Sequence, residues 1–132
     1  MHSSAKGDLG VVKVIARLTE LGWNVGVLIT EHQHYDLLAE KQSKMIRVQV
    51  KYAPIKRNII AADLRCIWAN TSGTKVRYYS TGDYDVLALY CPDLDKCYFV
   101  PMVEVENSQR SLGLSLKQSY ATNRLAENYE KI

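Results

Sequence analysis

Three residues near the middle of the chain have the types and spacing that metal-assisted chemistry requires: Asp36, Gln49 and Lys51. Gln49 and Lys51 lie two positions apart in a segment that alternates apolar and polar residues, so they share one face of a strand. A short hairpin turn joins this segment to the strand that Asp36 opens, and antiparallel pairing can bring the Asp36 carboxylate beside them. We therefore expect one site that combines a carboxylate, an amide and an ammonium group.

Carboxylate and amide oxygens are hard ligands suited to Mg²⁺, which keeps several waters and takes few protein ligands. A lysine beside such an ion can orient or help deprotonate an attacking water and can offset charge that builds on a phosphate. These are the parts that metal-assisted hydrolysis of a phosphodiester needs. The same three residues also fit a polar sheet face with one Asp–Lys pair, and the spacing alone leaves both interpretations open.

A helix is expected before the site, over residues 6–21, because its apolar residues recur at helical spacing: Val11, Val14, Ile15, Leu18 and Leu21. Ser3 or Ser4 is its expected cap, and Gly22 is expected to end it. Strands are expected at 23–29 (largely buried), 35–40, 45–52, 60–69, 74–79, 85–91 and 96–100, with weak helical periodicity over 117–131. This order predicts one domain over residues 1–132, with a mixed α/β fold in which a helix at each end flanks a central sheet.

The composition supports a folded protein, with 47% hydrophobic and 23% charged residues among 132. No apolar run approaches the ~18 residues of a membrane span, and no signal peptide is recognisable, so we expect no membrane association. Three cysteines, without the spacing of a zinc site, suit a reducing cytosol. The expected location is the cytoplasm.

Basic residues are concentrated in residues 41–80, which hold nine Lys and Arg and a single acidic residue. Such a stretch is typical of a surface that faces phosphates, although a solvated basic face is the alternative. Arg and Asn can read base edges, Lys more often contacts phosphate, and a two-stranded ribbon fits the major groove. The candidate DNA-binding residues are Lys56, Arg57, Asn58, Arg65, Lys75 and Arg77.

Several segments together resemble the PD-(D/E)XK nuclease superfamily, and within it the homing endonucleases encoded in bacterial group I introns. They are KGDLG at 6–10, EHQHYD at 31–36, IRVQVK at 46–51, DVLALYC at 85–91, CYFVP at 97–101 and the final Tyr129-Glu130. The resemblance implies a restriction-endonuclease-like mixed sheet and Mg²⁺-dependent cleavage of double-stranded DNA, with Mn²⁺ as a substitute ion. It matches Asp36, Gln49 and Lys51 to the catalytic motif, and Asp36, Gln49 and Val50 to the metal.

The sequence departs from the family pattern at two positions. Tyr35 replaces the proline that commonly precedes the aspartate, and Val11 occupies a first-helix position where relatives commonly carry a glutamate. Without that carboxylate, Asp36 and Gln49 provide one formal negative charge, so metal affinity should fall. Either this chain is a weakened or inactivated nuclease, or Asp8 or Glu31 substitutes; alternatively, Val11 simply packs in the core.

The resemblance implies a site-specific endonuclease of the homing type that acts on double-stranded DNA. Cutting both strands with one active centre per chain favours a dimer on a pseudo-palindromic site, and the likeness to intron-encoded enzymes suggests a tetramer. Two alternatives stay open: a sequence-specific DNA-binding protein that keeps the fold but cleaves little, and a structure-specific junction nuclease.

Overall fold

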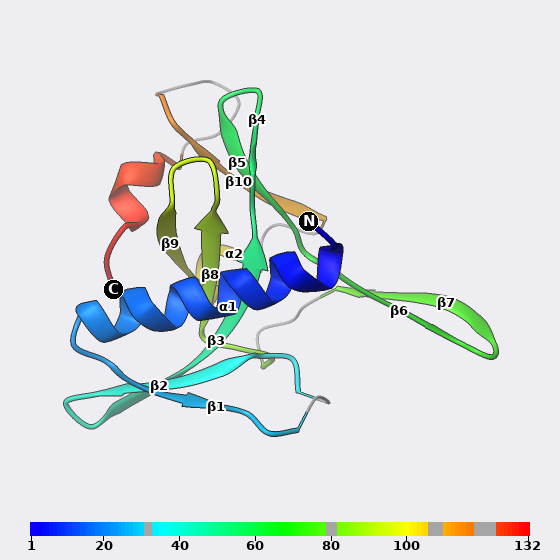
Figure 1. The fold of residues 1–132 in the computed structure, drawn as a ribbon, viewed down its shortest axis with the longest axis horizontal. Helices are drawn as coiled ribbons and strands as arrows, with labels where there is room; N and C mark the ends of the chain where they lie inside the picture. The colour runs from blue at the N-terminus through cyan, green and yellow to red at the C-terminus, as the bar shows by residue number, and fades with distance from the viewer. Residues whose placement is uncertain (31–32, 79–81, 106–109, 118–123) are drawn as a thin grey trace.

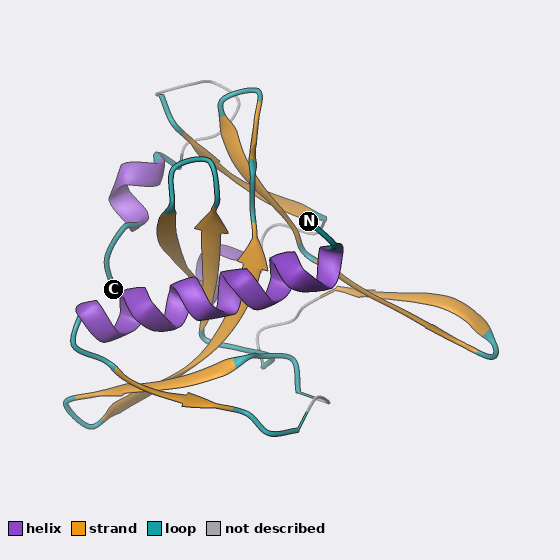
Figure 2. Cartoon of the chain, in the orientation of Figure 1, coloured by secondary structure: helices purple, strands orange, loops and turns teal. Residues whose placement is uncertain are grey.

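The computed structural model describes residues 1–30, 33–78, 82–105, 110–117 and 124–132, with backbone only at 66–70 and 77–78. Helix α1 (Ser3–Glu20) comes first, and the central strands are β1 (Asn24–Val27), β2 (Leu37–Lys41), β3 (Lys44–Tyr52), β8 (Val86–Cys91) and β9 (Lys96–Pro101). The other elements are β4 (Ile55–Lys56), β5 (Ile59–Asp63), β6 (Arg65–Asn70), β7 (Gly73–Tyr78), α2 (Met102–Val105), β10 (Ser111–Ser115) and a 3-10 turn at Ala126–Tyr129. Figures 1 and 2 show their arrangement.

The central sheet has five strands in the order β1-β2-β3-β8-β9, and it is mixed because β3 and β8 run parallel while the other neighbours are antiparallel. Helix α1 crosses one face of this sheet (Figure 1). It buries Val14 and Leu18 against Val48 and Phe99. This α/β architecture with a mixed central sheet confirms the expected fold class.

The opposite face of the central sheet is covered by a three-stranded sheet, in the order β10-β5-β4, and by α2. Leu87 and Leu89 of β8 are buried there with Ile60 of β5 and Leu114 of β10. The central sheet therefore has a helix side and a second-sheet side. The polar residues of β3 lie on the second-sheet side, because they alternate with Val48 and Val50.

Strands β6 and β7 form a separate two-stranded sheet (Figure 1), which extends away from the rest of the molecule. The sequence predicted this hairpin but placed its first strand at 60–69. The structure instead divides that segment at Leu64, which is buried and donates its N–H to the Arg110 carbonyl at 2.9 Å. The residues before Leu64 join the three-stranded sheet, and those after it form the hairpin.

The ends of α1, the burial of β1 and the C-terminal segment differ from the sequence-based expectations. The cap of α1 is His2, whose ring accepts the Ser4 N–H at 3.4 Å, and Gly22 follows the helix at φ 92°. Strand β1 lies at the sheet edge and is mostly exposed, not buried. In the described part of 117–131, a 3-10 turn replaces the expected helix. No helix among the described residues is both long and apolar enough to span a membrane.

Candidate active site

The β2–β3 hairpin places Asp36 beside the middle of β3. Its two turn residues, Gln42 and Ser43, have φ values of 51° and 68°, the left-handed conformations that a tight hairpin needs. This turn sets the register in which Leu37 pairs with Val48. The residue before Leu37, Asp36, therefore lies next to β3 just before β2 begins, and its N–H donates to the Val48 carbonyl at 2.8 Å.

The Asp36 carboxylate is held by the backbone of β3. Its Oδ2 atom accepts the Val50 N–H at 2.8 Å, so the second carboxylate oxygen is left for another partner. Burial raises the pKa of Asp36 above its usual value, against smaller lowering effects from the Val50 N–H and the Lys51 charge. The structure thus brings together Asp36, Val50 and Lys51, three of the four residues assigned to the motif.

Gln49, the fourth residue, lies on the second-sheet side of β3, where it pairs with Leu87 of β8. Its side chain is 9% exposed and makes no hydrogen bond among the described residues. Its amide oxygen lies on the same face of β3 as Lys51 and is therefore a candidate ligand for a cation at this face.

The donor set at this point fits a hard divalent cation. Asp36 and Gln49 provide side-chain oxygens, and the Val50 carbonyl faces the same strand edge as the Val50 N–H that Asp36 accepts. No group of three or more His, Cys, Asp and Glu side chains gathers among the described residues, so a softer ion such as zinc lacks ligands there. Two or three oxygen donors with bound water suit Mg²⁺ or Mn²⁺.

Val11 lies on the helix side of the sheet, packed against the cluster that contains Val14 and Val50. The preceding Gly10 is buried against β3, where an added Cβ would be in ordinary van der Waals contact with Val50 Cγ1 at 3.5 Å. This placement agrees with the interpretation that Val11 packs in the core. Of the two proposed substitutes, Asp8 is exposed on α1, and Glu31 lies outside the described residues.

Arg47 lies on the same face of β3 as Gln49 and Lys51 but had no role in the sequence-based interpretation. The structure gives it a bidentate ion pair with Asp85: Nε donates to Oδ2 at 3.2 Å and Nη2 to Oδ1 at 3.1 Å. Nη1 also donates to the Gly82 carbonyl at 2.6 Å, and the guanidinium lies 5.9 Å from the Tyr35 ring centroid. Only the alternation of β3 hinted at this residue, because its hydrogen-bond partners Asp85 and Gly82 are 38 and 35 residues away in sequence.

The candidate DNA-binding residues divide into three groups. Lys56, Arg57 and Asn58 are exposed at the β4–β5 turn, where Arg57 and Asn58 have φ values of 53° and 63°. Arg65 is instead engaged at the root of the hairpin, where its Nη2 donates to Asp63 Oδ2 at 2.6 Å. Lys75 is exposed on β7, and the Arg77 side chain lies outside the described residues.

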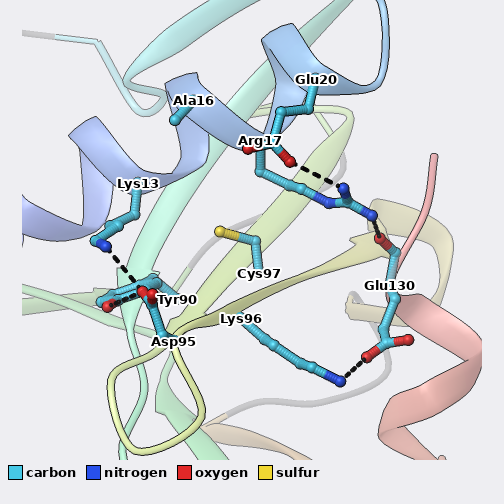
Figure 3. A pocket seen from close by; sticks show the side chains of 9 residues that line it. All are labelled: Lys13, Ala16, Arg17, Glu20, Tyr90, Asp95, Lys96, Cys97 and Glu130. Atoms are coloured by element: carbon cyan, nitrogen blue, oxygen red, sulfur yellow. Dashed lines mark hydrogen bonds and ion pairs between the residues drawn. The ribbon is translucent and has the colours of Figure 1, made fainter.

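The pocket drawn in Figure 3 lies elsewhere, between α1, the β8–β9 hairpin and the C-terminal segment, with a volume of about 460 Å³. Its cations are paired: Lys13 with Asp95 at 2.9 Å, Arg17 with Glu20 at 3.2 Å and Lys96 with Glu130 at 2.8 Å. Each of these cations therefore has an acidic partner within the chain. Because α1 lines the pocket, it lies on the helix side of the central sheet, away from Gln49.

A family model described as PD-(D/E)XK endonuclease matches residues 1–131. The chain belongs to the PD-(D/E)XK endonuclease family. Among solved structures, the bacterial homing endonuclease I-Ssp6803I is similar, with a TM-score of 0.80 and 21% identity over 98% of this chain and 88% of that chain. No curated protein matches the sequence.

Proposed function

We propose that this PD-(D/E)XK family member is a Mg²⁺-dependent, site-specific endonuclease that hydrolyses double-stranded DNA. The observation that carries the proposal is the Asp36 carboxylate, held 2.8 Å from the Val50 N–H and within reach of the Lys51 charge, on the strand that also carries Gln49. Family membership and the similarity in fold to the bacterial homing endonuclease I-Ssp6803I support the same class of reaction.

In the proposed mechanism, Asp36, Gln49 and the Val50 carbonyl hold the ion, which supplies Lewis-acid activation of a phosphate oxygen and a water when bound. Lys51 follows Val50 directly on β3, and its ammonium charge reaches the Asp36 carboxylate. It orients the attacking water and offsets the negative charge that builds on the phosphate. The backbone of β3 keeps Asp36 in place while the DNA approaches.

The β6–β7 hairpin and the β4–β5 turn are the proposed grip on DNA. Lys56, Arg57 and Lys75 are exposed on these two elements. Lys51 links them to the site, because its charge also reaches Asp63, which pairs with Arg65 at the hairpin root. A two-stranded ribbon fits the major groove, so a duplex bound along the hairpin would bring a phosphate to the root, where Asp36 and Lys51 lie.

A binding protein with little cleavage is the second candidate, and the packing of Val11 in the core favours it. With valine there, Asp36 supplies the only formal negative charge among the proposed ligands. The protein would then depend on the DNA phosphate for the remaining charge that holds the ion. The endonuclease and the binding protein predict different cleavage rates but the same DNA affinity.

The test is cleavage of long genomic DNA with Mg²⁺ by the wild type, Lys51→Ala and Val11→Glu, with Lys131→Ala as a control at an exposed lysine outside the site. We expect discrete fragments from the wild type and Lys131→Ala, and a rate at least ~100-fold lower for Lys51→Ala. Val11→Gln, which adds the same length without charge, is the control for Val11→Glu.

Three outcomes separate the candidates. Fragments from the wild type that disappear with Lys51→Ala support the endonuclease. Cleavage by Val11→Glu alone, and not by Val11→Gln, identifies this chain as a disabled nuclease that binds DNA. Retarded DNA in a gel with no cleavage by any variant contradicts the endonuclease and leaves the binding protein.

A further inference from the structure

The Arg47 guanidinium is held by hydrogen bonds from all three of its nitrogen atoms. Two of its nitrogens donate to the two carboxylate oxygens of Asp85, and the third donates to the Gly82 carbonyl. The backbones are joined as well: Arg47 N–H donates to Asp85 Oδ2 at 2.8 Å, and Asp85 N–H donates to the Arg47 carbonyl at 2.9 Å. A bidentate pair of this kind sets the orientation of the guanidinium as well as its position.

The Tyr35 ring lies against this fixed guanidinium, 5.9 Å from Arg47 Cζ to the ring centroid, within the range of a cation–π contact. Tyr35 is half-buried and also packs against the core cluster on the second-sheet side. Its ring is therefore held between an apolar surface and a cation that cannot rotate freely.

Asp36 lies outside β2, which begins at Leu37. The position of Asp36 therefore depends on Tyr35, the residue that precedes it in the chain. Among the described residues, one backbone bond (to the Val48 carbonyl) and one side-chain bond (from the Val50 N–H) hold Asp36. We propose that Arg47 is a positioning residue that, by holding the Tyr35 ring, keeps the Asp36 carboxylate on the Val50 N–H. The significance of this contact for catalysis rests on the proposed function.

The competing explanation is that Arg47 only joins β3 to β8 through Asp85. The side chains of this ion pair are 34% and 42% exposed, so that contribution to stability is small. A purely structural role would loosen β3 and β8 together. A positioning role acts at Val50 first, because the amide hydrogen of Val50 is covered by the Asp36 carboxylate.

The test is amide hydrogen exchange measured by NMR on the protein without metal or DNA. Arg47→Lys keeps the charge but loses the planar contact with the ring, and Tyr35→Leu keeps apolar packing but removes the ring. We expect both to speed exchange of the Val50 amide about 10-fold relative to the amides of β8 and β9, and the double variant to add nothing further. Tyr35→Phe keeps the ring and should leave Val50 unchanged.

Arg17→Lys is the matched control, because Arg17 pairs with Glu20 on the helix side of the sheet. The proposal is wrong if Arg47→Lys changes Val50 exchange no more than Arg17→Lys, or only in proportion to β8 and β9. A Mn²⁺ titration followed by electron paramagnetic resonance adds the link to function: we expect about 10-fold weaker binding in Arg47→Lys. Faster Val50 exchange in a protein that binds no Mn²⁺ would support the positioning and contradict the proposed function instead.

Discussion

Asp36 combines two properties that oppose each other at the scale of one residue. Its carboxylate is half-buried, which raises its pKa, and it is kept ionisable by the Val50 N–H and the Lys51 charge. A buried charge lowers stability unless a partner compensates it. The residue is therefore suited to binding a cation and poorly suited to stabilising the fold alone.

We expect Asp36→Asn to raise the melting temperature at pH 7 in the presence of EDTA. The folded pKa of Asp36 is raised, so the folded state binds more protons than the unfolded state. Stability of the wild type therefore falls as pH rises from the usual range of an aspartate through the raised pKa. Asparagine removes this loss, and its amide oxygen can still accept the Val50 N–H.

Thermal unfolding of both proteins from pH 3 to pH 8 tests this expectation. The advantage of Asp36→Asn should disappear at pH values below the ordinary aspartate pKa, where the wild-type carboxyl is protonated in both states. An Asp36→Asn protein that melts below the wild type at pH 7 would mean that the carboxylate stabilises the fold. Glu40→Gln, at a half-buried residue of β2 that bonds to Asn24, is a control for loss of one charge.

At the scale of elements, the β6–β7 hairpin depends on its root. The Arg65 guanidinium lowers the pKa of Asp63 to about 2, with a smaller contribution from the Lys51 charge. Arg65 also bonds through its own N–H to Asp63 Oδ1 at 2.9 Å. These contacts lie where β5 passes into β6, so they set the direction in which the hairpin leaves the body.

We expect Arg65→Ala and Lys75→Ala to weaken DNA binding for different reasons. Lys75 is exposed, so its loss should lower affinity by one phosphate contact and leave the melting temperature unchanged. Loss of Arg65 removes the partner of Asp63 at the hairpin root, so it should also lower stability, by less than ~1 kcal/mol for a partly exposed pair. DNA titration together with thermal unfolding distinguishes the two.

The Asp63→Asn variant provides the control at the root. If Arg65 acts through Asp63, Asp63→Asn should reproduce part of the Arg65→Ala loss in DNA affinity although no cation is removed. If Asp63→Asn binds DNA as tightly as the wild type or more tightly, Arg65 contacts the DNA itself.

At the scale of the whole molecule, the central sheet separates two kinds of surface. The helix side carries α1 and the internally paired charges of the pocket in Figure 3. The second-sheet side carries Gln49 and the proposed site, with the exposed cations of the β4–β5 turn and β7 nearby in the chain. Part of the excess of basic residues in 41–80 is thus exposed on the β4–β5 turn and β7 as Lys56, Arg57 and Lys75.

We expect the DNA affinity to fall steeply with salt, because each phosphate contact releases condensed counterions. With at least three contacts per chain, the log–log slope should be about −3 or steeper. Lys56→Gln should reduce the slope by about 1, and Lys131→Gln should leave it unchanged. A slope near zero in the wild type would mean that the basic stretch does not face DNA.

Self-association as a dimer or tetramer remains a proposal about the whole molecule. Residues 81–132 hold eight acidic and five basic residues, and this acidic part of the chain is the proposed self-association surface. Glu104 lies in it but has partners within the chain: the Tyr129 hydroxyl donates to it at 2.6 Å and Arg124 Nε at 3.4 Å. Charge reversal there would disturb the fold of the same chain. Sedimentation of the wild type is therefore the better measurement of assembly. Glu106, the acidic residue two positions further along, lies outside the described residues.

The sequence by itself determined the local features that depend on near neighbours along the chain. The helical spacing of Val14 and Leu18 placed α1, and the alternation of β3 put Gln49 and Lys51 on one face. A short turn at 41–44 then indicated that antiparallel pairing can bring Asp36 beside this segment. These inferences succeeded because side-chain period and turn geometry act over a few residues.

Only the tertiary structure decided which surfaces meet. The edge position of β1 and the division at Leu64 depend on partners that join through sheet order and not through local pattern. The contact of Arg47 with Asp85 and Tyr35 is of the same kind, as is the packing of Val11 on the helix side. Such contacts form between residues distant in sequence, and a single sequence carries no record of their distances.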